Sequence, residues 1–349
     1  MNEYFSLYNT TSHAVKSVDA GLKVGGPATA GLAWVPEFIN YTKTSGAPAD
    51  IVTTHHYPTD LRHGPYNRST WEDNILTQAA IANDAGFPLV MTEISAGLNN
   101  GYDSYFAASF VVHAAAAFLG VDSVPTLSYW TFTDVFEEPG MQSTPWAETF
   151  GIQTKWGVPK PAYRGLQLIS LFAASPNLLV PVNASDPGAA PRSWAALKSA
   201  AAQATATSGT VDIITAVDTT STPGVAAVHA LVTNYNINID NTEDPTSGLP
   251  IVAETVTLSI AGLPQGAKPS SALLRLQDST HGWAKTTWIA NGSPTYPTPA
   301  QIASELAASQ WGEIQLGVPT IDPTTGVATI TLPEMEPYAV GLVSLVFTV

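Results

Sequence analysis

The sequence predicts a chain of mixed class, α/β in its first half and all-β in its second. Up to residue 175, short apolar runs alternate with segments of helical periodicity, which is typical of βα units around a parallel sheet. From residue 176 onward, apolar and polar residues alternate between Gly, Pro and Asn turns. We therefore predict an α/β domain over residues 1–175 and a β-sandwich domain over residues 176–349.

The first half contains an initial helix and then four strands, each followed by a helix. Apolar spacing places the initial helix over Tyr4 to Val15. The strands are predicted over residues 22–27, 51–57 and 88–93, with a fourth strand and its loop over residues 124–136. The helices that follow them are predicted over residues 35–44, 71–83, 103–119 and 161–172. A closed (βα)8 barrel needs eight of each, so the pattern predicts a partial TIM barrel, about its second half.

The second half contains short strands and one expected helix. The strands are predicted around residues 211–214, 228–232, 255–260, 272–276 and 327–332. The helix is predicted over Pro299 to Ala308, because Thr298 is a suitable cap and Pro299 is favoured at the first helical position.

The composition excludes several classes of partner and chemistry. The formal net charge of −15 repels nucleic acid and anionic membranes, while the low share of charged residues, 12%, suits neutral ligands such as sugars. The absence of cysteine excludes disulfides, thiolate zinc sites and cysteine nucleophiles. We expect no cofactor, no nucleic-acid partner and no membrane partner.

The first residues and the hydropathy pattern bear on the compartment. No run of about 18 apolar residues is present, and the segment that starts at Met1 has neither a basic nor an apolar leader pattern. We expect a soluble protein without an export signal of its own. The sequence leaves open whether it is cytoplasmic or secreted from a microbe.

Glu93 is the first candidate for catalysis. It ends an apolar strand, and residues at the carboxyl ends of barrel strands face the mouth where such barrels carry their active sites. A carboxylate placed there can act as nucleophile or general base. The alternative interpretation is a capping or salt-bridged glutamate.

Adjacent histidines on the strand over residues 51–57 raise a second question. Because side chains alternate along a strand, His55 and Tyr57 share one face and His56 takes the other, so the two histidines do not form a joint metal site. Asp60 and His63 keep a metal alternative open. Donors that line a sugar pocket are the simpler interpretation of His55 and Tyr57.

The segment from Ser128 to Glu138 combines aromatic and acidic side chains. Trp130 offers an aromatic face, and Glu137 and Glu138 offer carboxylates that accept hydrogen bonds from hydroxyl groups. The alternatives are core packing for Trp130 and a solvated loop for the two glutamates. The sequence has no G-x-S-x-G, Walker or G-x-G-x-x-G motif, so a carboxylate-based hydrolase remains.

The chain resembles glycoside hydrolase family 39, the β-xylosidase and α-L-iduronidase family, over nearly its whole length. The resemblance rests on several segments together: residues 22–27 (LKVGGP), 55–57 (HHY), 92–93 (TE), 128–138 (SYWTFTDVFEE), 160–162 (KPA), 278–288, 292–294 and 297–302. It implies a (βα)8 barrel, a retaining exo-glycosidase activity and small neutral saccharides as ligands.

The resemblance also implies roles for individual residues. Glu93 takes the position of the nucleophile, and the sugar subsite is implied for His55, Tyr57, Trp130, Glu137 and Glu138. Few basic residues accompany these positions, which favours a neutral xyloside or glucoside over iduronate.

One departure from the family is large. The family's acid/base glutamate belongs to an Asn-Glu-Pro motif, which is absent from this sequence, and Asn2-Glu3 is followed by Tyr4 instead. We expect an N-terminally truncated chain with weak or altered activity and with self-association through an exposed half-barrel. A catalytically degenerate sugar-binding protein and a fragment of a longer enzyme stay open as alternatives.

Overall fold

The computed structural model describes most of the chain. The described residues are 1–60, 68–97, 101–174, 178–180, 182–184, 202–205, 209–218, 225–238, 246, 248, 250–263 and 266–348. The chain divides into two compact units. The first comprises Met1–Asn99, Phe118–Trp130 and Ile237–Pro245, and the second comprises Asn100–Ala117, Thr131–Asn236 and Thr246–Val349.

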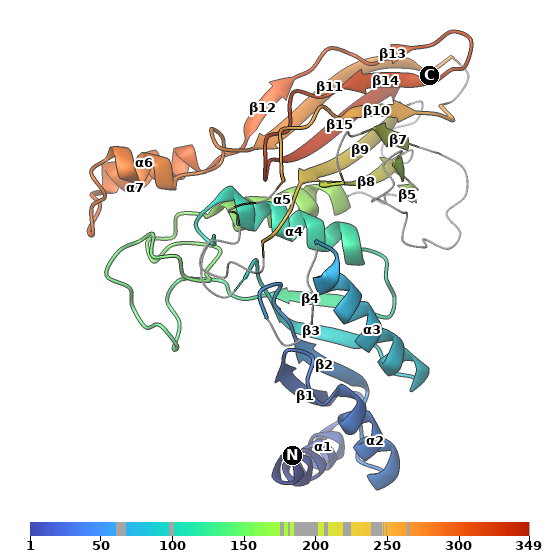
Figure 1. The fold of residues 1–349 in the computed structure, drawn as a ribbon, viewed down its shortest axis with the longest axis vertical. Coiled ribbons are helices and arrows are strands. Elements are labelled where there is room, and N and C mark those ends of the chain that lie inside the picture. The colour runs from blue at the N-terminus through green and yellow to red at the C-terminus, as the bar shows by residue number, and fades with distance from the viewer. Residues whose placement is uncertain are drawn as a thin grey trace. The chain divides into compact units, whose positions relative to one another are not determined.

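The first unit is built on a four-stranded parallel sheet. Its strands are β1 (Gly25–Ala30), β2 (Ile51–His55), β3 (Leu89–Ile94) and β4 (Thr126–Tyr129), in the order β1-β2-β3-β4 (Figure 1). The helices are α1 (Asn2–Val18), α2 (Val35–Ser45) and α3 (Thr70–Asp84). Helix α2 contacts β1 and β2, the strands that it connects, and α3 contacts β3 and α2. The predicted order of one helix followed by alternating strands and helices is confirmed.

Aromatic packing fixes α1 in this unit. Phe5, Tyr8 and Ser12 are its buried residues, at the spacing that puts side chains on one helical face. Phe5 stacks on Tyr41 of α2, with ring centroids 4.5 Å apart. At the other end of the helix, Lys16 pairs with Asp50, with 2.9 Å between the charged atoms.

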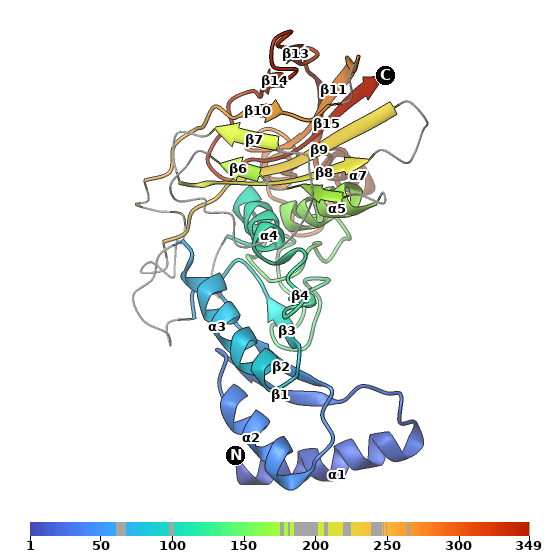
Figure 2. The same cartoon turned by 90° about the vertical axis from the view of Figure 1, so that its right-hand side faces the viewer.

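The second unit contains the remaining elements. The helices are α4 (Tyr105–Phe118), α5 (Pro161–Ala173), α6 (Lys285–Ala290) and α7 (Pro299–Ala308). The last residue of α4, Phe118, is counted with the first unit. One sheet has the order β12-β11-β15-β9-β8-β5 and the other β13-β14-β10-β7-β6. Their strands are β5 (Leu178–Val180), β6 (Val182–Ala184), β7 (Ala202–Thr205), β8 (Val211–Asp218), β9 (Val225–Asn234), β10 (Thr257–Ile260), β11 (Lys268–Gln277), β12 (Gly312–Gln315), β13 (Thr320–Ile321), β14 (Ala328–Thr331) and β15 (Val340–Thr348) (Figure 1 and Figure 2).

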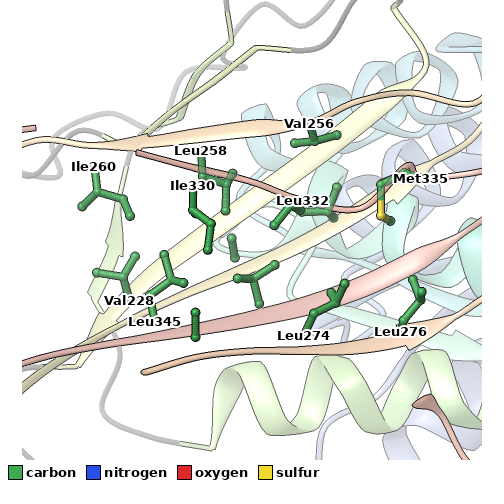
Figure 3. Packing of buried hydrophobic residues seen from close by; sticks show 14 of the residues in the cluster. Val228, Val256, Leu258, Ile260, Leu274, Leu276, Ile330, Leu332, Met335 and Leu345 are labelled. Carbon is green, nitrogen blue, oxygen red and sulfur yellow. The ribbon is translucent and has the colours of Figure 1, made fainter. Parts of the chain in front are cut away.

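One apolar cluster joins the two sheets of the second unit. Leu258 and Ile330 belong to the five-stranded sheet, while Val228, Leu274 and Leu345 belong to the six-stranded sheet, and all five are buried in the same cluster (Figure 3). In β10 and β14, every second residue is buried, so the period of two in the sequence follows from burial on one face of these strands. Helix α5 contacts β9, β11 and β15.

Helices α6 and α7 form a pair that extends from the strands (Figure 1). The prediction for α7 is confirmed in its bounds and in its cap, because Thr298 and Gln301 form a reciprocal capping box before Pro299. The expectation of one helix in this half was wrong, since α6 is a second one. Its six residues include Thr286 and Thr287, which are poor helix formers, so the sequence carried little signal.

Two predicted strands of the first half have other bounds in the structure. The strand predicted over residues 22–27 is shifted to Gly25–Ala30, and the backbone N–H of Val24, just before it, donates to the Asp50 carboxylate, 2.7 Å away. Within the strand and loop predicted over residues 124–136, the strand covers Thr126–Tyr129, and Thr131 forms backbone hydrogen bonds with Phe150 and Ile152. The compact units interleave along the chain, so the domain boundary between residues 175 and 176 stays a prediction.

Candidate functional site

The carboxyl ends of the parallel strands bring several predicted site residues together. In the sheet register, Ala30 of β1 is the partner of His55 in β2, and His55 is the partner of Glu93 in β3. The backbone N–H of Trp130, directly after β4, donates to the carbonyl of Ile94, 2.8 Å away. His55, Glu93 and Trp130 therefore lie at the same end of the sheet, where the carboxyl ends of its strands meet, as predicted from their places at strand ends.

Tyr57 and Glu93 are joined by a hydrogen bond. The Tyr57 hydroxyl donates to the Glu93 carboxylate, with 2.8 Å between Oη and Oε2. Tyr57 is buried, whereas Glu93 and His55 are half-buried. The rings of His55 and Tyr57 meet edge to face, with centroids 6.2 Å apart. The site thus holds a partly accessible carboxylate whose orientation is fixed by a buried phenol.

His56 is buried, unlike its half-buried neighbour His55. Its side chain is 1% exposed, and its backbone carbonyl accepts a hydrogen bond from the Trp71 indole N–H, 2.9 Å away. Asp60 Oδ2 lies 3.8 Å from His56 Nδ1. His63, which the metal alternative included, lies outside the described residues. In the part of the chain that is described, no three His, Cys, Asp or Glu side chains group as metal ligands do.

The segment after Trp130 continues in the second unit. Glu137 and Glu138 are exposed, and Trp130 itself is half-buried. Because Trp130 and the two glutamates belong to different units, the structure does not place the glutamates against Glu93. Their assignment to a sugar subsite, like that of the other site residues, stays a prediction.

A buried ionic cluster in the second unit was missed by the sequence analysis. Lys160 lies between two aspartates, with its Nζ 2.7 Å from Asp103 Oδ1 and 2.8 Å from Asp134 Oδ2. It also donates to the carbonyl of Thr149, 2.8 Å away. The Asp103 carboxylate also accepts a hydrogen bond from the backbone N–H of Glu148.

The titration of this cluster follows from its burial. Burial raises the pKa of the Asp134 carboxyl to about 6, against the opposing attraction of the Lys160 ammonium. Burial also acts to lower the pKa of Lys160, but Asp103 and Asp134 outweigh it and hold that pKa above its ordinary value. The signal in the sequence was the acidic and basic residues themselves. Their convergence from three segments was not visible in the pattern.

None of the helices in the described residues combines the length and the apolar character that a membrane crossing requires.

Comparison with known proteins places the chain in a family. The family described as Glycosyl hydrolases family 39 matches residues 1–322. A β-xylosidase from Caldicellulosiruptor saccharolyticus is 35% identical over 187 residues, and one from Geobacillus stearothermophilus is 31% identical over 184 residues. The solved structure of a family 39 enzyme from Xanthomonas axonopodis pv. citri shares the fold, with a TM-score of 0.68 at 24% identity over 98% of this chain.

Each of these relatives is longer than the part of it that this chain matches. The alignments cover 48% and 46% of this chain but only 37% and 35% of the two β-xylosidases. The structural match covers 63% of the Xanthomonas chain. The chain thus corresponds to less than two thirds of each of these relatives.

Proposed function

The chain belongs to Glycosyl hydrolases family 39, and we propose that it is a retaining glycosidase for β-xylosides or related neutral glycosides, with Glu93 as nucleophile. The observation that carries the proposal is the place of Glu93 at the carboxyl end of β3, where it is the register partner of His55 and accepts a hydrogen bond from Tyr57. The similarity to two β-xylosidases supports the choice of sugar.

The proposed fold is the one implied by the family. We infer that the four parallel strands of the first unit are consecutive strands of a (βα)8 barrel. The two sheets that share the apolar cluster of the second unit correspond to a β-sandwich. This arrangement puts the strand ends that carry His55, Glu93 and Trp130 at the mouth of the barrel.

The chemistry of a retaining glycosidase gives Glu93 a defined step. Its carboxylate attacks the anomeric carbon, the leaving-group oxygen departs with the bonding electron pair, and a covalent glycosyl-enzyme forms. Water then attacks the same carbon, gives up one proton to solvent, and releases the sugar and the free carboxylate. The Tyr57 hydroxyl holds Glu93 Oε2, so that the carboxylate is oriented before the attack.

The second carboxyl of such a mechanism lies about 5–5.5 Å from the nucleophile and protonates the leaving group. The Asn-Glu-Pro motif that supplies it in the family is absent from this sequence. General acid catalysis is worth about 10²–10⁴-fold, and less for a leaving group that is already a stable anion. We therefore propose weak activity, with nitrophenyl glycosides cleaved faster than natural oligosaccharides.

The remaining predicted site residues have binding roles in this proposal. His55 and Trp130 contribute a polar group and an aromatic face at the sheet edge, and Glu137 and Glu138 contribute carboxylates for sugar hydroxyls. The end strands of the described sheet, β1 and β4, are where we propose self-association. A monomer by light scattering would count against that proposal.

Hydrolysis of 4-nitrophenyl β-xyloside tests the function. The chain is expected to release nitrophenol, and Glu93→Ala is expected to abolish this turnover. Glu37→Ala, which replaces an exposed glutamate of α2 in the same unit, serves as the control and should leave turnover unchanged. Azide should accelerate release of the glycosyl-enzyme in the unaltered chain. Equal turnover with and without Glu93 contradicts the proposed nucleophile.

A second candidate function is a sugar-binding protein without catalysis. The side chains of His55, Tyr57 and Trp130 favour it, because polar and aromatic groups of this kind can hold a sugar without cleaving it. Calorimetry with xylose and xylobiose separates the two functions. Binding without any Glu93-dependent turnover supports this second function.

A further inference from the structure

Two large aromatic side chains are exposed next to each other in the second unit. Trp156 is 40% exposed and Tyr296 is 79% exposed, although both carry rings that proteins ordinarily bury. Their ring centroids lie 6.4 Å apart at an interplanar angle of 69°. The two residues are far apart in the sequence, so the fold brings them together from separate segments.

A tight turn presents Trp156. The backbone N–H of Thr154 donates to the carbonyl of Val158, and that of Gly157 donates to the carbonyl of Thr154, both over 2.9 Å. Gly157 has a φ of 75°, which glycine adopts at little cost. The Val158 side chain next to the turn is fully buried. Trp156 thus stands on an anchored turn.

A proline-rich loop between α6 and α7 presents Tyr296. Pro294 and Pro297 flank the tyrosine, and proline restricts the backbone on both sides. The Trp288 indole N–H donates to the Pro294 carbonyl, 3.0 Å away. The capping box of Thr298 fixes the end of the loop. The tyrosine backbone is therefore held before any ligand arrives, which lowers the entropic cost of binding.

Lys155 connects the two rings to a third segment. Its ammonium lies 5.6 Å from the centroid of the Trp156 ring and 5.8 Å from that of the Tyr296 ring. It also donates to the carbonyls of Gln142 and Ser143, over 2.8 and 3.2 Å. Because its donors are engaged, Lys155 is a poor receptor for an anion. The net charge of −15 further disfavours anionic ligands.

We propose that Trp156 and Tyr296 form an aromatic platform that binds a neutral β-linked oligosaccharide chain. The C–H faces of pyranose rings pack on aromatic faces, and two rings held at an angle contact neighbouring sugars of one chain. The inference rests on the proposed function in taking a saccharide as the ligand. The platform contributes binding, and the bond cleavage is assigned to Glu93.

Titration of the whole chain with xylohexaose, followed by calorimetry, tests the platform. Trp156→Ala and Tyr296→Ala are each expected to raise the Kd by about 2–10-fold, the loss of one aromatic contact. Ile289→Ala removes a side chain of α6 that is 55% exposed and serves as the matched control, with an unchanged Kd. Trp156→Phe should restore most of the affinity. Turnover of 4-nitrophenyl β-xyloside, which carries one sugar, should be equal in all four variants.

The outcomes separate the platform from the nucleophile. If Glu93→Ala still binds xylohexaose and the two aromatic variants bind it less, the platform stands whatever becomes of the catalytic proposal. The platform is overturned if the unaltered chain does not bind xylohexaose. It is also overturned if the aromatic variants bind as the unaltered chain does, or if Ile289→Ala weakens binding equally. Thermal unfolding of each variant confirms that the comparison is between folded proteins.

Discussion

The two units each hold carboxylates in a polar network, but the networks differ in access and in charge balance. In the first unit, Glu93 is half-buried and accepts one hydrogen bond from Tyr57. In the second unit, Lys160 is fully buried between Asp103 and Asp134, with contacts of 2.7 and 2.8 Å. The first carboxylate is partly accessible, whereas the other two contact the Lys160 ammonium, and Asp103 also lies 3.6 Å from the Lys285 ammonium.

The difference indicates that the Glu93 carboxylate is suited to react with a substrate, whereas the Asp103 and Asp134 carboxylates are suited to stabilise the fold. A nucleophile must reach its substrate, so it has few partners and some exposure. A buried ion pair is costly to desolvate, and a substitution that removes one partner leaves the charge of the other partner uncompensated. Substitutions at Glu93 and Tyr57 should therefore affect turnover, and substitutions in the Lys160 cluster should affect stability.

The largest effect on stability is expected from Lys160→Met. The substitution leaves Asp103 and Asp134 buried without the central cation, and we expect a loss of about 3–5 kcal/mol in the free energy of unfolding. Urea denaturation followed by circular dichroism measures it. Lys160→Arg keeps the charge and should lose less. A Met variant as stable as the unaltered chain would contradict the structural role of the cluster.

The pH dependence of stability tests the Asp134 carboxyl. Its pKa is about 6 in the folded chain because burial raises it above the ordinary value of 3.8. The folded state thus binds the proton more tightly, and the favourable contribution, present below pH 4, is lost as pH rises through 6. Relative to Asp134→Asn, the unaltered chain should lose about 2–3 kcal/mol between pH 4 and pH 7.

Asp322 provides a control with the opposite sign. The backbone N–H of Thr324 donates to its carboxylate, which lowers the pKa of Asp322 below its ordinary value. Its stabilising contribution is present above the unfolded pKa and is lost as pH falls through the folded pKa. Relative to Asp322→Asn, the unaltered chain should gain stability as pH rises. The same direction of change for both variants would contradict the assignment for Asp134.

Tyr57→Phe should lower turnover with little effect on folding. The substitution removes the hydrogen bond to Glu93, and a bond to a charged group is worth about 1.5–3 kcal/mol, or roughly 10–100-fold in kcat/KM. Assay with 4-nitrophenyl β-xyloside measures the loss. Tyr41→Phe, in the same unit, leaves the ring that stacks on Phe5 and should change nothing. If both variants lose activity equally, Tyr57 does not orient Glu93.

The helices and the parallel strands were largely predictable because their signals are local. Thr298 as a cap and Pro299 at the first helical position predicted the start of α7, and the apolar run before Glu93 predicted β3. The predicted strands also predicted where each strand ends, so His55 and Glu93 were expected together at the carboxyl ends of neighbouring strands. The register confirms that they are partners.

The parts that were not predicted depend on contacts between distant segments. The extended segment after Tyr129 leaves the sheet because Thr131 exchanges backbone hydrogen bonds with Phe150 and Ile152. The ion pair of Asp103 with Lys160 was not predicted because the two residues are remote in the sequence. The pairing of Trp156 with Tyr296 has the same origin, since periodicity carries no information on which turns meet.

The smallest effect is expected at an exposed ion pair of the second unit. Arg275 Nε lies 3.1 Å from Glu313 Oε1, and the Glu313 side chain is 55% exposed, so solvent screens the attraction. Glu313→Gln should change the free energy of unfolding by less than about 1 kcal/mol, as urea denaturation in 0.1 M salt will show. Raising the salt to about 1 M should remove even this difference, while the loss in Lys160→Met should persist, because buried charges are screened much less. A salt-insensitive loss of several kcal/mol in Glu313→Gln would mean that exposure does not separate structural from incidental ion pairs in this protein.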